Sequence, residues 1–134
     1  MTKQIFLNLP VKNLNKSVEF FTRLGYTFNQ QFTDENATCM IISDTIYVML
    51  LVESYFKTFT TKEIANTKTT IEALLGLSAE SKEAVDKLVD AAISAGGSQP
   101  KEPQDLGFMY SRTFEDLDGH VWEIFWMNTN HVHS

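Results

Sequence analysis

Apolar and polar residues alternate at the start of the chain. Ile5 and Leu7 begin a run of apolar side chains at every second position, which predicts a strand over residues 3–11. The intervening side chains, Phe6 and Asn8 among them, point to the opposite face of such a strand. This second face mixes aromatic and amide side chains, so the pattern alone assigns it neither to the core nor to solvent.

The spacing of apolar residues then changes from two to three or four. Leu14, Val18 and Phe21 form a stripe typical of an amphipathic helix, and either Asn13 or Asn15 supplies a side chain that can cap its first turn. A glycine follows the stripe, and glycine commonly ends a helix. We therefore expect a helix directly after the first strand.

The rest of the pattern predicts a second long helix and more strands. This helix begins after Ser81, a residue type favoured at N-caps, and ends at paired glycines. The strand-like segments, which turn residues separate, are residues 26–32, 37–43, 45–52, 70–77, 108–114 and 120–127, with an irregular edge segment at 99–107. A short helix is expected near residues 62–66.

The same order of elements occurs twice. Each half reads as strand, helix, glycine and three strands, and the two starts, at Ile5 and about Thr70, lie close to half a chain length apart. Such an offset predicts an internal duplication. The fold class is then α+β, with one domain over residues 1–134. Its expected parts are a first βαβββ module at 1–52, a connector at 53–69, a second module at 70–127 and a polar tail at 128–134.

Each predicted module has one helix, which covers only one face of its sheet. The other face must meet its twin or a ligand. Two such sheets side by side would form a curved cup of mixed sheet, and this cup is the predicted place for function.

Charge and composition exclude several classes of partner. The formal net charge is −6 at pH 7, and no basic stretch offers a face for phosphates, so we expect no nucleic-acid partner. The longest apolar run, residues 46–52, is far shorter than the roughly 20 residues needed to span a bilayer. Cys39 is the single cysteine and fits a reducing compartment. Without a recognisable signal peptide, a cytoplasmic protein is expected.

Three short motifs carry a resemblance to a known family. They are LPVKNL at residues 9–14, SVEFF at 17–21 followed by LGY at 24–26, and FEDLDGHVWE at 114–123. In this order they resemble the vicinal oxygen chelate superfamily, which includes glyoxalase I, extradiol dioxygenases and bleomycin resistance proteins. The resemblance implies the paired-module fold and a homodimer. It says less about activity, because one scaffold hosts lyases, dioxygenases and binding proteins.

Enzymes of this superfamily hold a divalent metal in the cup, through His, Gln or Glu on the first, fourth, fifth and eighth strands. The resemblance places these positions at Phe6, Met49, Leu74 and Glu123. Only Glu123 carries a donor atom. No cofactor is therefore expected, and Glu123 is retained as a residual metal ligand candidate.

A displaced metal site is the alternative to this interpretation. Gln4, Asn8 and Glu72 lie two residues from the expected positions and could join Glu123. A shift of two residues moves a donor by about 6.6 Å along a strand, which is far for one ion. A divalent metal is thus the minority expectation.

Arg112 is expected to lie opposite Glu123. This pairing requires the last two strands to form a hairpin whose loop around Leu117 and Asp118 has two or four residues. The pair could be a structural ion pair, an anchor for a polar ligand, or, through Glu123, a remnant of the metal site. The Arg112 guanidinium could also bind a ligand carboxylate or phosphate.

Aromatic residues are candidates for ligand contact. Strand parity assigns four of them to the face of Glu123, namely Phe6, Tyr110, Phe114 and Phe125. They could stack on a planar ligand or pack against a neighbouring module or subunit. The connector adds Tyr55, Phe56 and Phe59, which could cover the cup or simply pack.

These observations favour a small-molecule-binding protein similar to the glyoxalase and bleomycin resistance group. The ligand is expected to be small and partly apolar, with Arg112, Asn8 and Glu123 orienting it and no membrane or nucleic acid involved. One alternative is a metal-dependent lyase or dioxygenase with displaced ligands. Another is a structural or regulatory protein whose cup is filled by its own side chains.

Overall fold

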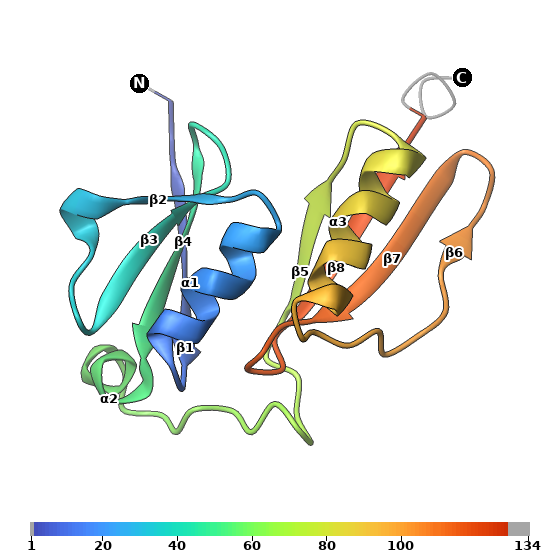
Figure 1. Ribbon diagram of the computed structural model, residues 1–134. Coiled ribbons are helices and arrows are strands. Elements are labelled where there is room, and N and C mark those ends of the chain that lie inside the picture. Colours follow the sequence, from blue (N-terminus) through green and yellow to red (C-terminus); the bar gives the residue numbers. More distant parts are fainter. Residues whose placement is uncertain (1, 129–134) are drawn as a thin grey trace. The chain divides into compact units, whose positions relative to one another are not determined.

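The protein divides into two compact units. The structure, a computed structural model, describes residues 2–128, and its units cover residues 1–65 and 66–134 (Figure 1). Of the predicted tail at 128–134, only Asn128 lies within the described residues.

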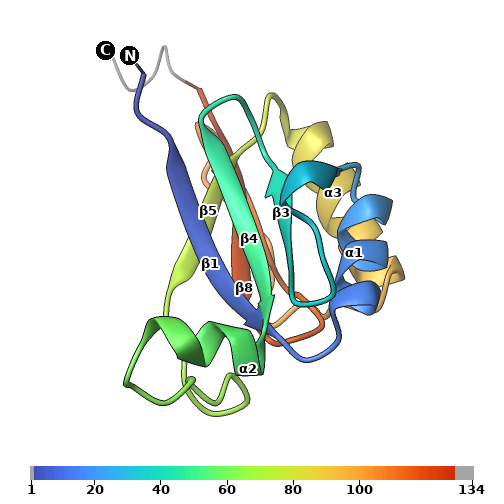
Figure 2. The ribbon, with the colours of Figure 1, turned by 90° about the vertical axis from the view of Figure 1, so that its left-hand side faces the viewer.

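The first unit is a four-stranded mixed sheet with one long helix. Its elements are β1 (Ile5–Val11), α1 (Leu14–Arg23), β2 (Thr27–Asn29), the 3-10 helix η1 (Gln30–Phe32), β3 (Ala37–Ile41), β4 (Ile46–Val52), α2 (Glu53–Phe56) and the 3-10 helix η2 (Lys57–Phe59). The strand order is β1-β4-β3-β2, with β1 and β4 parallel and the other pairs antiparallel. Figure 2 shows α2 directly after the end of β4.

The second unit repeats this topology. Its elements are β5 (Leu74–Ser78), α3 (Lys82–Ser94), β6 (Gln104–Asp105), β7 (Met109–Glu115) and β8 (Val121–Met127). The order β5-β8-β7-β6, with β5 and β8 parallel, matches the first sheet strand for strand. The predicted α+β fold with a βαβββ unit occurring twice is confirmed.

Local capping explains where both long helices begin. The Asn13 side chain accepts a hydrogen bond from the backbone N–H of Lys16, so Asn13 and not Asn15 is the N-cap of α1. Ser81 does the same for α3, accepting from the N–H of Ala84. Each helix then buries one stripe against its own sheet. Ser17 and Phe20 of α1 are buried, whereas the predicted stripe residue Val18 is only partly so.

Two local predictions are wrong. Residues 26–32 do not form one strand, because β2 ends at Asn29, whose side chain accepts from the N–H of Gln31 and starts η1. The connector helix is not at residues 62–66 but directly after β4, as α2 and η2. This earlier helix places the connector aromatics next to the first sheet.

The hairpin between β7 and β8 has a different register from the predicted one. Glu123 pairs with Thr113, and Arg112 pairs with Ile124. The cause is a loop with an odd number of residues. The N–H of Asp116 donates to the carbonyl of His120, and three residues lie between the two. A one-residue shift turns every side chain of a strand to the other face.

Arg112 consequently lies on the face of the sheet that α3 covers, together with Tyr110 and Phe114. The guanidinium donates at 2.9 Å to both Asp86 and Asp90 of α3, and at 3.1 and 2.8 Å to the side-chain oxygen of Gln99. The Tyr110 hydroxyl donates to Asp86 at 2.6 Å. The predicted Arg112–Glu123 pair is therefore wrong, and Arg112 ties α3 to its sheet.

Asp116 organises the loop of the same hairpin. Its Oδ1 accepts from the N–H groups of Asp118 and His120, and its Oδ2 accepts from the indole N–H of Trp122 at 3.0 Å. Burial raises the pKa of the Asp116 carboxyl, against the effect of His120 and these donors. The carboxyl group thus holds three donors inside the unit.

Replacing Asp116 by Ala is expected to lower the free energy of unfolding by about 2–4 kcal/mol, because three donors lose their acceptor where water cannot easily replace it. Urea denaturation measures this change. Asp44→Ala is the control, since Asp44 is an exposed turn residue of the first unit, and it should cost less than about 0.5 kcal/mol. Equal losses in the two variants would contradict the role of Asp116.

Tyr110→Phe is expected to raise the pKa of Asp86 toward its ordinary value. The hydrogen bond from Tyr110, followed by the contacts with Arg112, lowers the pKa of this carboxyl in the folded protein. Asp86 therefore stabilises the fold above its unfolded pKa, and this contribution is lost as the pH falls through the lower folded pKa. Carbon-13 NMR titration of Asp86 reads the pKa directly. Tyr47→Phe is the control, because the Tyr47 hydroxyl donates to a backbone carbonyl; an unchanged Asp86 pKa in Tyr110→Phe would contradict the prediction.

Candidate functional site

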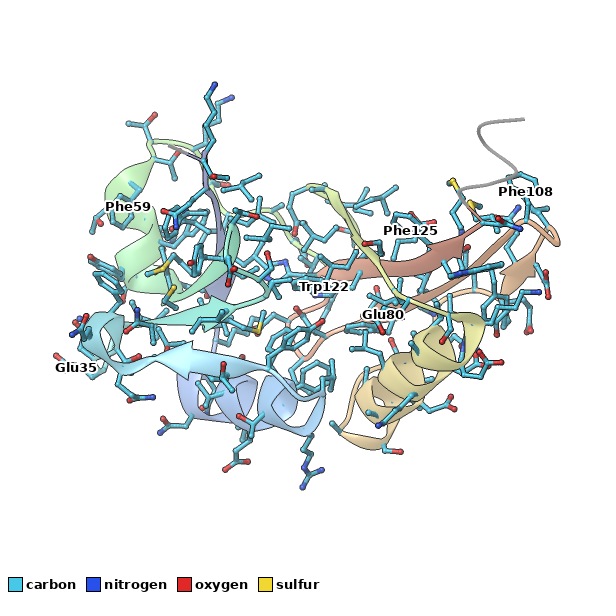
Figure 3. The ribbon with its side chains drawn as sticks, turned by 90° about the horizontal axis from the view of Figure 1, so that it is seen from above. Glu35, Phe59, Glu80, Phe108, Trp122 and Phe125 are labelled. Carbon is cyan, nitrogen blue, oxygen red and sulfur yellow. The ribbon has the colours of Figure 1, made fainter. Side chains whose placement is uncertain are left out.

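A pocket of about 320 Å³ lies on the first sheet, on the face turned away from α1. The alternation of the strands creates this face: Leu9, Val48 and Leu50 are buried on the α1 side, and their neighbours point the other way. Figure 3 shows Phe59 and its helix on the side of the sheet opposite α1. All lining residues belong to the first unit.

The floor of the pocket comes from three adjacent strands. Asn8 of β1 and Met49 of β4 are direct neighbours in the sheet register, and both line the pocket. Ala37 of β3 and Leu51 of β4 form another neighbouring pair, both buried. The floor is therefore mainly apolar, with the Asn8 amide as its polar group.

Aromatic side chains from α2, η2 and η1 form the walls. The rings of Tyr55 and Phe59 meet edge to face, with centroids 5.2 Å apart and planes at 81°. Phe32 of η1 lines the pocket too. These rings are unusually open for aromatic residues, with 67% of Phe59, 60% of Phe32 and 38% of Tyr55 exposed. Of the connector aromatics, Tyr55 and Phe59 thus reach the pocket, whereas Phe56 does not line it.

One acidic residue, Asp34, lines the pocket beside the polar residues Gln31 and Thr33. Asp34 lies in the turn before β3, where its Oδ1 accepts from the N–H groups of Asn36 at 2.7 Å and Ala37 at 3.0 Å. These two bonds fix the carboxylate at the pocket. The sequence pattern predicted only a turn for this segment. Asp residues in turns often accept a hydrogen bond from the backbone N–H two residues later, and this tendency could have indicated the fixed side chain.

Phe6 lies on the same face as Asn8 and Met49 but outside the pocket lining. Its ring stacks on that of Tyr47, with centroids 4.9 Å apart and planes at 14°. Of the three predicted site residues in the first unit, the structure thus places Asn8 and Met49 together in a pocket and Phe6 beside it.

The predicted site residues of the second unit separate into two groups. Leu74, Glu123 and Phe125 belong to the face turned away from α3, as Figure 3 shows for Phe125. Tyr110 and Arg112 lie on the α3 face, where their polar atoms bind Asp86. They are not available to a ligand together with Glu123, contrary to the predicted register.

Glu123 has a cationic neighbour other than the predicted one. Its Oε1 lies 3.9 Å from Nζ of Lys101. Thr113, its partner in the sheet, is buried with a side-chain oxygen that has no hydrogen-bond partner among the described residues. The polar groups of this face are thus the Thr113 hydroxyl and the Glu123 carboxylate, and the lysine that pairs with Glu123 is exposed.

The sequence pattern did not predict one partly buried polar contact of the second unit. His120 Nδ1 lies 2.6 Å from Glu72 Oε1, beside the Asp116–Trp122 hydrogen bond. The sequence pattern marked His120 only as a neighbour of the turn. The contact joins residues 48 positions apart, and no local pattern announces it.

The side chains at the superfamily's metal positions do not fit a metal. Three of the four, Phe6, Met49 and Leu74, have no ligand atom that a hard or borderline divalent cation would choose. Across residues 2–128, no group of three His, Cys, Asp or Glu side chains could hold an ion.

The displaced candidates make hydrogen bonds of their own. The Gln4 amide nitrogen donates at 3.3 Å to the carbonyl of Asp44, and Glu72 binds His120. Asn8 donates to its own strand at the carbonyl of Phe6.

No helix among the described residues is long and apolar enough to cross a membrane. The predicted absence of nucleic-acid and membrane partners, the homodimer and the cytoplasmic location remain predictions.

Comparisons with known proteins find relatives for both sequence and fold. Residues 3–43 match the family described as bleomycin resistance protein-like N-terminal. No protein with a curated description matches the sequence. Among solved structures, the hypothetical protein SA1046 from S. aureus is 28% identical, with a TM-score of 0.79 over 94% of this chain and 95% of that one.

Two further solved structures come from proteins whose family or function is named. A glyoxalase/bleomycin resistance protein/dioxygenase family enzyme from Burkholderia phytofirmans PsJN is 19% identical, with a TM-score of 0.79 over 94% of this chain and 99% of that one. The fosfomycin resistance protein FosX from Mesorhizobium loti is 11% identical, with a TM-score of 0.71 over 100% and 99%. At these identities the likeness shows the fold. Together with the sequence match over residues 3–43, the shared fold supports the resemblance to the vicinal oxygen chelate superfamily.

Proposed function

We propose that this protein binds a small, partly apolar ligand in the pocket of its first unit, without the metal usual in the superfamily. One observation carries the proposal: an open pocket of about 320 Å³ whose floor is apolar and whose walls are exposed aromatic rings. Pockets of this size are typical of small-molecule sites. Burial of apolar ligand surface against Met49 and Leu51 would supply most of the affinity.

The polar groups of the pocket would orient the ligand. Asn8 offers its side-chain oxygen, because its amide nitrogen already donates to the carbonyl of Phe6. Arg112, which the sequence suggested for this role, is engaged with α3 instead. Glu123 belongs to the second unit and does not line this pocket. Binding rather than catalysis is favoured because the metal positions Phe6, Met49 and Leu74 are apolar.

The resistance proteins among the relatives support a binding role by analogy. The family matched by residues 3–43 is described through bleomycin resistance. A protein that confers resistance by sequestering a drug needs a pocket and no reaction. We further propose a cytoplasmic homodimer, which rests on the resemblance to the superfamily and on the single cysteine, Cys39, which fits a reducing compartment.

A thermal-shift screen tests this function. The probes are divalent metals, glutathione conjugates, catechols and glycopeptide antibiotics, added to protein purified without a histidine tag. A true ligand should stabilise the folded state by about 2.7 kcal/mol at a hundredfold excess over its dissociation constant. Phe59→Ala should weaken that ligand at least fivefold, because the variant removes a wall of the pocket. Leu106→Ala is the control, an exposed apolar residue of the second unit, and should bind normally.

Two outcomes would contradict the proposal. Stoichiometric Ni, Zn, Mn or Fe that stabilises the protein and is lost in Glu123→Ala would favour the metal-dependent lyase or dioxygenase. A ligand whose affinity is the same in Phe59→Ala and in the unchanged protein would bind outside this pocket.

A further inference from the structure

Charge is distributed unevenly around the pocket of the first unit. Asp34 is its single charged lining residue, and neither lysine nor arginine lines it. Asp34 forms no ion pair within residues 2–128, and its carboxylate accepts the N–H groups of Asn36 and Ala37 through Oδ1, leaving Oδ2 for another donor or cation. A carboxylate without a cationic partner beside an apolar floor favours the binding of a positively charged ligand.

The aromatic walls favour the same charge. The face of an aromatic ring is the negative part of its quadrupole, and it attracts cations within about 6 Å of the ring centre. The rings of Tyr55 and Phe59 pack edge to face at 81°, and both residues line the pocket together with Phe32. The exposed fractions of Phe59 and Phe32 leave their surfaces free for contact.

The combination also selects the kind of cation. Metal sites in proteins usually combine several charged or imidazole ligands, whereas this pocket offers one carboxylate and otherwise neutral groups, the amides of Asn8 and Gln31 and the hydroxyl of Thr33 among them. An ammonium group covered with methyl groups binds water weakly and presents apolar surface, so aromatic rings suit it well. The remaining part of such a molecule could lie on the apolar floor made by Met49 and Leu51.

We propose that the pocket binds organic cations that carry a quaternary or methylated ammonium group. The cationic head lies between Tyr55, Phe59 and Asp34, and the apolar part of the ligand covers the floor. This inference rests on the proposed binding function in the same pocket and names the class of its ligand.

A pair of isosteric probes tests the charge preference. 3-Hydroxyphenyltrimethylammonium and 3-tert-butylphenol have nearly the same shape. The first has a cationic nitrogen where the second has a neutral carbon. Both are titrated into the full-length protein, with NMR signals of the Met49 methyl group and the Tyr55 ring reporting binding. We expect the cation to bind at least tenfold more tightly than the neutral probe, and its affinity to fall as the salt concentration rises.

Two variants distinguish the effect of the Asp34 carboxylate from the effect of the protein's overall negative charge. Asp34→Asn keeps the side-chain oxygen that accepts from Asn36 and Ala37 but removes the charge. It should weaken the cation at least threefold and leave the neutral probe unchanged. Glu35→Gln is the matched control, because Glu35 is exposed next in sequence and does not line the pocket; it should leave both affinities within experimental error. Phe59→Ala should weaken the cation more than the neutral probe.

The outcomes distinguish this inference from the proposed function. Equal affinity for the two probes, with shifts at Met49 and Tyr55, overturns the cation preference and leaves ligand binding in the pocket intact. Equal weakening by Asp34→Asn and Glu35→Gln overturns the specific role of Asp34. If neither probe shifts these signals and no member of the thermal-shift panel is sensitive to Phe59→Ala, both proposals fail.

Discussion

One helix cannot cover both faces of a four-stranded sheet, and the candidate site results from this constraint. In the first unit α1 buries the side chains of one strand parity, including Val48 and Leu50. The residues between them are turned to the other face by the pleat of the strands. That face must be covered by something else or remain open. Here a short aromatic segment covers it in part, and a pocket remains.

The position of that aromatic segment depends on a local event at the end of β4. The chain turns directly into α2 at Glu53 and continues into η2 up to Phe59. This turn brings Tyr55 and Phe59 to the pocket whose floor includes Met49 and Leu51 of the same strand. In the second unit, no helix comes after β8 among the described residues. The two halves share a topology, and the pocket is built from the first unit's own chain.

The sequence revealed the fold because its main signals are local. The alternation through Leu9, the caps Asn13 and Ser81 and the repeated order of elements are all readable over a few residues. Strand parity put Asn8 on the face of Phe6, and the family resemblance named Met49; both line the pocket of the first unit. The predicted register of the last hairpin was wrong because it depended on the number of residues in the loop. The loop has three residues and not two or four, and this difference places Arg112 on the other face of the sheet. Contacts such as His120 with Glu72 join distant segments, so sequence spacing could not disclose them.

One face of the first sheet packs against α1 and the other carries the pocket, and the candidate site depends on this difference. Met49 and Met40 lie on adjacent strands and opposite faces, and Met40 is fully buried. Relaxation of methionine methyl signals by a soluble paramagnetic probe compares the two directly. We predict strong relaxation of the Met49 methyl group and almost none for Met40. Equal protection of both methyl groups would show that the pocket face is closed, and would contradict the open site.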